Sequence, residues 1–120
     1  MGLDQTLTLT RPGDSTMEFE WRKANALHRW FVEHIQGGDD DCGTYQVLPS
    51  ELRELRDTLK QVINNRALGP KLLPTQEGFL FGSTDYDSDY LDDAFLALQD
   101  ITEVLVHCRP GDRITYSSSW

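Results

Sequence analysis

The fold is decided by the stretch Phe79-Leu80-Phe81-Gly82-Ser83-Thr84-Asp85-Tyr86-Asp87-Ser88-Asp89-Tyr90, in which the residue pattern changes within a few positions. An apolar run ends at Gly82, hydroxyls and alternating carboxylates follow, and apolar residues at helical spacing then begin. This predicts a strand over 77–83 and a helix that starts near 87–89 and ends near 107. Functional sites often lie at the junction between a strand and the helix that follows it, so we expect functional residues here.

Periodicity predicts the remaining elements. Near alternation over 3–10 and 17–21, with a turn at 11–15 between them, predicts a β-hairpin. The other expected elements are a helix over 22–36, a short strand over 44–48, a helix capped by Ser50 and closed by Asn64-Asn65, a loop over 71–76 and a weak strand over 113–118. The last helix is expected to bury a stripe made of Leu91, Ala94, Phe95, Leu98, Ile101 and Leu105.

Together these elements predict an α+β fold in a single domain spanning residues 1–120. Three helices are expected to pack on one face of a small, mainly antiparallel sheet, whose strand order the pattern does not indicate. The segment 112–120 is expected to form an edge strand and a loose tail, from which an exposed Trp120 would anchor a partner.

The chain is acidic, because 20 Asp and Glu residues against 11 Lys and Arg residues give a net charge of −9. A protein that binds nucleic acid needs the opposite balance, so direct nucleic-acid binding is not expected. An acidic protein instead suits a basic partner, such as the nucleic-acid-binding groove of another protein. The alternative is that the charge only maintains solubility.

The sequence predicts neither a membrane segment nor a secretion signal. No apolar run is long enough to span a bilayer, and the start of the chain lacks a basic region followed by an apolar one. The two cysteines, Cys42 and Cys108, stand far apart, as is typical of free thiols in a reducing cytosol. We therefore expect a cytosolic protein that does not bind membranes.

The spacing of Asp85, Asp87 and Asp89 suggests a calcium loop, but two required residues are missing. Tyr90 occupies the place of the loop glycine and Leu96 the place of the final acid, which excludes an EF-hand. A looser magnesium or calcium site is one alternative. Helix capping is favoured, with Thr84-x-x-Asp87 as a capping box and acids at the positive end of the helix.

A second constellation is Trp21-Arg22-Lys23-Ala24-Asn25-x-x-His28, which places two cations at an expected helix start. Cations are unfavourable there, so they require either a bound anion, such as a nucleotide phosphate, or internal acidic partners. Pairing with the acids of 39–41 or 85–89 is favoured because acids are in excess. His28 is expected beside the apolar face of the helix, with one ring nitrogen hydrogen-bonded.

No catalytic motif is present. His28, His34 and Cys42 match no zinc spacing, and nothing near Cys42 marks an activated thiolate. The chain also lacks a glycine-rich phosphate loop, a GxSxG elbow and an HExxH motif. We therefore predict no metal, no cofactor and no catalytic residue, and we favour a binding protein over an enzyme.

Four segments are distinctive as a set: MGLD at 1–4, WRKANALHRWF at 21–31, LPT at 73–75 and FLFGSTDYD at 79–87. With these segments, and with the acid-cysteine loop DDCG at 40–43, the chain resembles a widespread family of small, uncharacterised proteins of tailed bacteriophages and prophages. The resemblance covers roughly residues 1–105. It implies a protein of the host cytoplasm that binds and inhibits a host protein, including defence systems such as CRISPR–Cas.

Two functional hypotheses follow. The first is docking of an acidic surface on a basic host protein, through Asp39, Asp40, Asp41, Asp85, Tyr86, Asp87, Asp89, Tyr90, Asp92 and Asp93. The alternative is a protein or enzyme that binds a small ligand such as a nucleotide, in a pocket made of Trp21, Arg22, Lys23, Asn25, His28, Cys42, Ser83, Thr84 and Asp85. A concave arrangement of the second set would favour the alternative.

Overall fold

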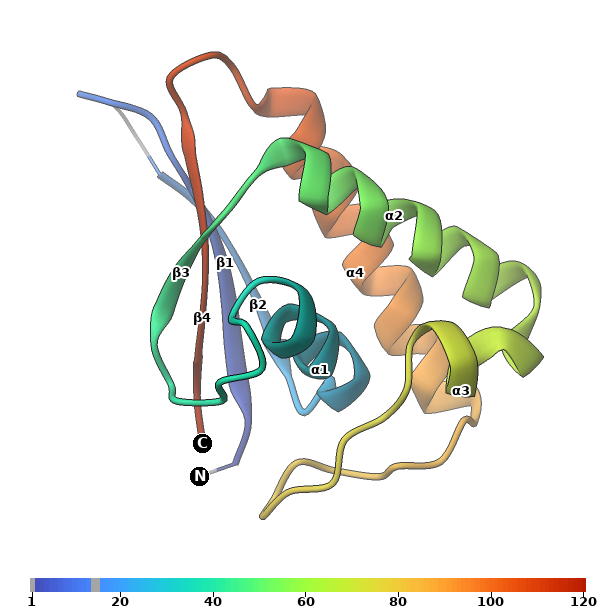
Figure 1. Cartoon of the computed structure of the whole chain (residues 1–120). Helices are drawn as coiled ribbons and strands as arrows, with labels where there is room; N and C mark the ends of the chain where they lie inside the picture. Colours follow the sequence, from blue (N-terminus) through green and yellow to red (C-terminus); the bar gives the residue numbers. More distant parts are fainter. Residues whose placement is uncertain (1, 14–15) are drawn as a thin grey trace.

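The computed structural model describes residues 2–13 and 16–120, which form an α+β fold (Figure 1). Within these residues the elements are β1 (Asp4–Thr10), β2 (Thr16–Arg22), α1 (Asn25–His34), β3 (Thr44–Val47), α2 (Pro49–Asn64), η1 (Arg66–Leu68), α3 (Gly69–Leu72), α4 (Ser88–His107) and β4 (Arg113–Ser119). This part of the chain thus holds four α-helices where three were expected. The additional helix, α3, is short and begins with Pro70 in its first turn, where proline is well tolerated.

The described strands form one antiparallel sheet in the order β2-β1-β4-β3. The predicted hairpin is confirmed, with Leu7 of β1 opposite Phe19 of β2. The prediction of an edge strand and a loose tail over 112–120 is wrong, because β4 pairs with β1 on one side and with β3 on the other. Its alternation is weak in sequence because serine and threonine line its outward side, whereas Ile114 and Tyr116 point into the core.

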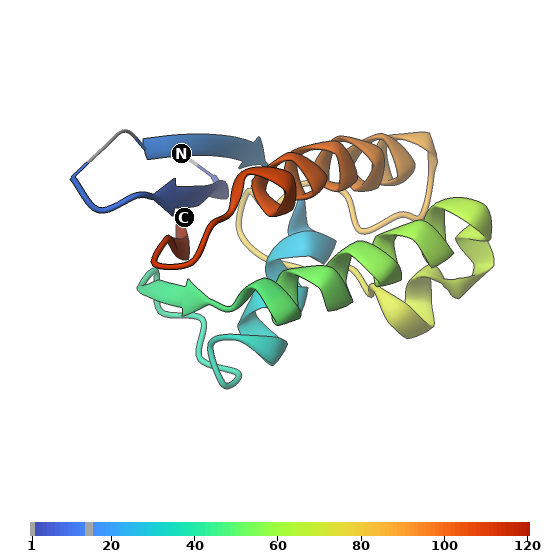
Figure 2. The same cartoon turned by 90° about the horizontal axis from the view of Figure 1, so that it is seen from above.

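The helices α1, α2 and α4 cover one face of the sheet, as the two perpendicular views show (Figures 1 and 2). The core lies between these layers. Phe31 of α1 stacks on Tyr116 of β4, with ring centroids 3.9 Å apart and planes within 6° of parallel. Both rings are fully buried. Helix α1 therefore packs on β4, one of the two middle strands of the sheet. The position of α1 in turn determines where the loops around it lie.

The first helix begins at Asn25 and not at the expected position 22. Arg22 is still paired with Asp4 in the hairpin, and the backbone reverses at Lys23, whose φ is 54°. The buried Gln5 side chain stabilises this reversal, since it accepts from the Ala24 N–H at 3.0 Å and donates to the Ala24 carbonyl at 3.2 Å. Arg22 and Lys23 consequently lie just before the N-cap residue Ala24 and outside the first turn of α1.

The predicted strand over 77–83 is wrong, since this segment is irregular. Leu80 has a φ of 58°, so the apolar run is not extended, and of its three apolar side chains only Phe81 is buried whereas Phe79 is 83% exposed. Gly78 lies against the ring of Phe81, where a Cβ atom would come within 2.6 Å. The Phe81 N–H donates to the Gly78 carbonyl at 3.1 Å, which closes a turn in place of a strand.

Two helix starts differ from their predicted caps. Helix α2 begins at Pro49, before Ser50, and the Glu51 side chain accepts from the Leu48 N–H at 2.8 Å. Helix α4 is capped by Asp87, whose carboxylate accepts from the Tyr90 N–H at 3.1 Å. Carboxylate capping at this junction is therefore confirmed, but Asp87 supplies the cap and Thr84 does not.

Helix α4 packs through a slightly different face from the one predicted. Its buried residues are Tyr90, Ala94, Ala97, Ile101 and Val104. Phe95, expected in the buried stripe, is 51% exposed. None of the helices in residues 2–13 and 16–120 combines the length and apolar character that crossing a bilayer requires.

Truncation of Ile101 and of Phe95 tests this orientation of α4. We expect Ile101→Ala to lower the free energy of unfolding by about 2–5 kcal/mol, because it leaves a cavity in the core. Phe95→Ala should cost about 0.5–1 kcal/mol, because the side chain is half exposed. Urea denaturation followed by circular dichroism measures both values, and equal losses would show that α4 is rotated.

Candidate functional site

The loop over 73–87 is held against α1 by the side chain of Asn25, the first residue of that helix. The Asn25 amide nitrogen donates to the carbonyls of Phe81 and Ser83, at 3.1 and 2.9 Å, and its oxygen accepts from the Gln76 N–H at 3.1 Å. Asn25 is buried, its bond to Phe81 is buried as well, and its bonds to Ser83 and Gln76 are partly buried. One side chain thereby fixes the backbone of the loop at both ends of its turn.

Tyr86 and Tyr90 hold the same loop against the start of α4. The Tyr90 hydroxyl donates to the Leu73 carbonyl at 2.7 Å, and the Tyr86 hydroxyl accepts from the Thr75 N–H at 3.1 Å. The two rings meet edge to face with centroids 4.9 Å apart. Both tyrosines, expected as partner anchors, therefore use their hydroxyls within the protein.

A pocket of about 230 Å³, here termed the junction pocket, opens between the end of β2, the start of α1 and the start of α4. Its floor is apolar and includes the buried side chains of Leu27, Leu59 and Leu73. Its charged lining residues are Arg22, Lys23, Asp85, Asp87, Asp89 and Asp93. The pocket thus combines an apolar interior with a charged rim.

Carboxylates outnumber cations around the junction pocket by four to two. The pKa of Asp93 is raised to about 6. The main cause is partial burial, which removes water from the carboxylate, and the nearby carboxylates of Asp89, Asp92 and Asp87 add to it. Four carboxylates against two cations leave a local surplus of negative charge, which adds to the loss of water in disfavouring ionisation of Asp93. A positively charged group placed in the pocket would relieve it.

The two cations near the pocket pair differently from the prediction. The Arg22 Nε donates to Asp4 Oδ1 at 3.0 Å, so its partner is neither in 39–41 nor in 85–89. Lys23 lines the junction pocket, and its stem packs near Gly82. Because Arg22 already has a carboxylate of its own, it offers the pocket little neutralising charge.

A second pocket, of about 450 Å³, adjoins the same loop and is here termed the aromatic pocket. Its lining residues are Gly2, Asp40, Gln76, Glu77, Gly78, Phe79, Phe81 and Trp120. Trp120 is not on a loose tail: its ring meets Phe81 with centroids 6.1 Å apart, and its Nε1 donates to Asp40 Oδ1 at 3.0 Å. The end of β4 and the loop after α1 therefore close this pocket together.

His28 connects Asp40 to the core of the sheet. It is fully buried and bonds through both ring nitrogens, where one bond was expected: Nε2 lies 2.9 Å from Asp40 Oδ1 and Nδ1 lies 2.6 Å from the Tyr116 hydroxyl. Burial raises the pKa of Tyr116, so its hydroxyl keeps its proton. That hydroxyl can donate to Nδ1 of a neutral imidazole, which leaves Nε2–H to donate to Asp40.

The residues predicted for a small-ligand pocket divide between several places. Five of them line the junction pocket: Arg22, Lys23, Asn25, Ser83 and Asp85. The other four do not. Trp21 is buried and donates to Asp100 at 2.9 Å, His28 lies in the core, Cys42 is exposed in the loop after α1, and the Thr84 carbonyl accepts from Thr75. The imidazole and the thiol are therefore not available to a ligand in this pocket.

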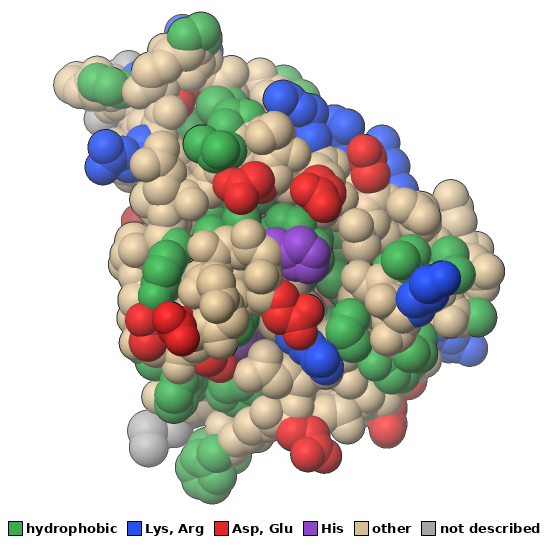
Figure 3. Space-filling view, in the orientation of Figure 1, with side chains coloured by type: hydrophobic (Ala, Val, Ile, Leu, Met, Phe, Trp, Pro, Cys, Tyr) green, Lys and Arg blue, Asp and Glu red, His purple; other side chains and the backbone are tan. Residues whose placement is uncertain are grey.

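The residues predicted for docking form two groups rather than one surface. Asp85, Asp87, Asp89, Tyr90 and Asp93 line the junction pocket, and Asp92 is exposed on α4 beside it. Asp39, Asp40 and Asp41 lie in the loop between α1 and β3, at a distance from the start of α4 (Figures 1 and 2). On the face shown in Figure 3, acidic side chains are spread in ones and twos among other residues.

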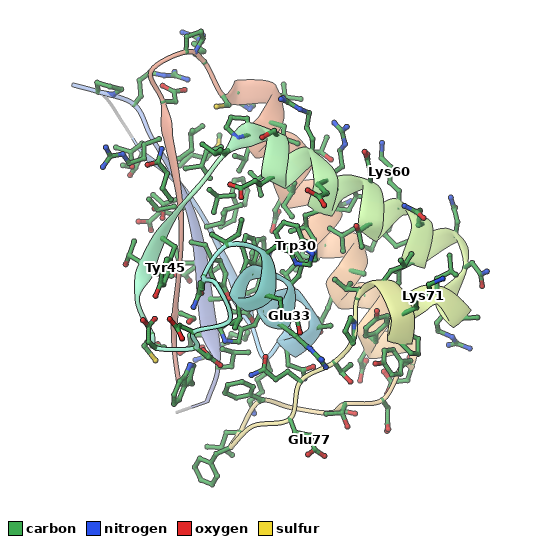
Figure 4. All side chains as sticks on the ribbon, in the orientation of Figure 1. Trp30, Glu33, Tyr45, Lys60, Lys71 and Glu77 are labelled. Carbon is green, nitrogen blue, oxygen red and sulfur yellow. The ribbon has the colours of Figure 1, made fainter. Side chains whose placement is uncertain are left out.

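Within the loop after α1, Asp41 has internal partners. It accepts from the Tyr45 hydroxyl at 2.6 Å and from the Gly43 N–H at 3.0 Å, and these bonds lower its pKa. The same contact raises the pKa of Tyr45 to about 12. Tyr45 lies on β3, on the opposite side of the molecule from Lys60 of α2 (Figure 4). Among the hydrogen bonds found in the described residues, the carboxylates of Asp40 and Asp41 each accept several, whereas Asp39 bonds only through its backbone, to Gln36.

Several residues of the two pockets were not expected from the sequence. Gln76 donates to Asp40 Oδ2 at 3.1 Å. The Tyr116 hydroxyl bonds to His28, which in turn bonds to Asp40. Phe79, read as part of a strand, forms a wall of the aromatic pocket. The glycines at 78 and 82 flanking the apolar run are the signal that indicates a turn there, and hence an exposed aromatic residue.

No group of three or more His, Cys, Asp or Glu side chains that could hold a metal ion occurs in the described part of the chain. Comparison of the chain with protein-family models, with curated proteins and with solved structures found no match. The arguments for function therefore rest on the chemistry of the two pockets.

Carboxyl NMR should show Asp93 titrating with a pKa near 6. Because its folded pKa lies above the ordinary value of 3.8, the contribution of Asp93 to stability is most favourable below about pH 4 and is lost as the pH rises through 6. Asp93→Asn removes this ionisable group, so it should raise the free energy of unfolding more at pH 7 than below pH 4. As a control, Asp89→Asn should lower the pKa of Asp93 by removing a neighbouring charge. Titration of Asp93 at its ordinary value would contradict the surplus of negative charge.

Proposed function

We propose that this chain is an interaction protein that binds a basic partner protein, with a lysine or arginine side chain of the partner inserted into the junction pocket. The observation that carries the proposal is the ring of four carboxylates around an apolar floor. Lysine and arginine pair an apolar stem with a charged head, and both parts would find a matching surface. Arginine is also a frequent anchor of protein interfaces.

The rim of the junction pocket supports this assignment. Asp85, Asp89 and Asp93 are exposed, so a cation can reach them without rearrangement of the loop. Loss of water and the neighbouring carboxylates raise the pKa of Asp93, so a positive charge bound beside it would favour its ionised form. The loop itself is already ordered by Asn25 and by the two tyrosines, which reduces the entropy lost on binding.

Binding of a nucleotide has weaker support. Its phosphates would face the four carboxylates of the junction pocket, against two cations of which Arg22 is paired with Asp4. The imidazole of His28 and the thiol of Cys42, which would have given such a pocket chemical variety, lie elsewhere. The charge of the site therefore favours a cationic ligand over an anionic one.

The resemblance to proteins of tailed bacteriophages extends the proposal to the identity of the partner. The partner would be a host protein in the host cytoplasm, and binding would inhibit it. A defence system such as CRISPR–Cas fits this requirement, because a protein that holds nucleic acid has a groove rich in lysine and arginine. A carboxylate pocket that captured one of these side chains would compete with the nucleic acid for it.

The direct test uses a fluorescently labelled hexaarginine peptide as a defined basic probe. We expect binding by fluorescence anisotropy that weakens when NaCl is raised from 50 to 300 mM. The double variant Asp89→Asn/Asp93→Asn should weaken binding by about tenfold or more, because it removes two of the rim charges. The matched double variant Asp57→Asn/Glu103→Gln changes net charge equally but lies outside the pocket. Equal losses in the two variants would refute a specific site.

Recovery of a host protein is tested separately from recognition of the basic group. In pull-downs from a bacterial host lysate, wild type and the matched variant should retain the same protein at low salt, and Asp89→Asn/Asp93→Asn should lose it. The retained protein should have a basic surface and should lose its own activity when the chain is added. Recovery that is identical for all three forms would contradict a role for the junction pocket.

A further inference from the structure

The aromatic pocket has a composition that the proposed function does not use. Its lining residues include the aromatic side chains of Phe79, Phe81 and Trp120 and the acidic residue Asp40. Phe79 is 83% exposed and Trp120 is 53% exposed, which leaves two large aromatic rings accessible from solvent. Exposed aromatic rings around one carboxylate are the arrangement by which proteins bind organic cations.

The Asp40 carboxylate is held rigidly, and most of its acceptor positions are occupied. Its Oδ1 receives hydrogen bonds from His28 Nε2 and Trp120 Nε1, and its Oδ2 receives one from Gln76 Nε2. These three hydrogen bonds fix the orientation of the Asp40 carboxylate at the edge of the pocket. Asp40 can therefore attract a cation through its charge but offers few lone pairs for further N–H donors.

We infer from this combination that the aromatic pocket binds a quaternary ammonium group, such as a trimethylated amine. Such a group has a positive charge and no N–H donor, so it needs ring faces and a nearby anion rather than hydrogen-bond acceptors. A primary ammonium has three N–H donors and would lose water that Asp40 cannot replace. The exposed rings of Phe79 and Trp120 supply the aromatic surface, the buried Phe81 supports Trp120 from behind, and Asp40 supplies the anion.

The pocket has room for this group and a suitable entrance. Its volume of about 450 Å³ leaves space around a trimethylammonium head and part of its chain. Glu77 lies on the loop at the edge of this pocket and points away from the body of the protein, which adds negative charge at the mouth (Figure 4). The inference is independent of the junction pocket, since no residue lines both pockets.

The test is a titration of the full chain with tetramethylammonium, followed by the indole N–H signal of Trp120 in NMR spectra at constant ionic strength. We expect this signal to shift, whereas those of the buried Trp21 and Trp30 should not. The neutral isostere of choline, 3,3-dimethyl-1-butanol, should bind at least about threefold more weakly than choline, because it lacks the charge. Choline and a trimethyl-lysine tripeptide then distinguish a free metabolite from a modified protein side chain as the source of the group.

Phe79→Leu is the informative variant, because Phe79 is exposed and its replacement keeps an apolar side chain without the ring. It should weaken tetramethylammonium binding by about three- to tenfold, and Asp40→Asn should weaken it further. The matched control Phe95→Leu changes a half-exposed phenylalanine outside the pocket and should have no effect. Asp89→Asn/Asp93→Asn should also have none, which separates this site from the junction pocket. Equal binding of the neutral isostere, or unchanged binding in Phe79→Leu, would overturn the inference.

Discussion

Both pockets depend on the buried amide of Asn25. It satisfies three backbone groups of a loop that has no strand partner, through Gln76, Phe81 and Ser83. Leaving a buried backbone group unsatisfied costs roughly 1–3 kcal/mol, so few other loop positions are accessible while this side chain is in place. Gln76 and Phe81 then continue into the aromatic pocket and Ser83 into the junction pocket. One helix-start residue thus orients two surfaces of different chemistry.

The two pockets handle their negative charge in different ways. Asp40 ends a chain of hydrogen bonds that runs from Tyr116 on the central strand through His28 on α1. Within a protein such a chain is stronger than in water, and it fixes the carboxylate in place. Among the described residues at the start of α4, only Asp87 is held in this way, as the helix cap, and neighbouring carboxylates add to the loss of water in raising the pKa of Asp93. The fixed carboxylate of the aromatic pocket suits a ligand that is recognised by its shape. The several carboxylates of the junction pocket suit a ligand that is recognised by its positive charge.

The sequence predicts the parts of the fold whose pattern is local. Helices α2 and α4 and the β1–β2 hairpin follow from periodicity, because each buries one side of a regular element. The errors occur where distant contacts decide. The apolar run at Phe79 reads as a strand, yet the Asn25 amide and the packing of Gly78 on Phe81 hold it in a turn. Likewise, no local signal relates Asp40 to Trp120 or Gln76, since only the assembled sheet brings these residues together.

The position of β4 has a consequence for how the protein is made. Leu7 of β1 faces Tyr116 of β4, so the two middle strands can join only after all the chain between them has been synthesised. Through most of translation the first hairpin must therefore expose one unpaired edge and its apolar side. Pairing over such a sequence separation is slow, so the hairpin remains without its second partner strand until the end of the chain is available. His28 gains its tyrosine partner in the same late step, so the sheet and the binding surfaces mature together.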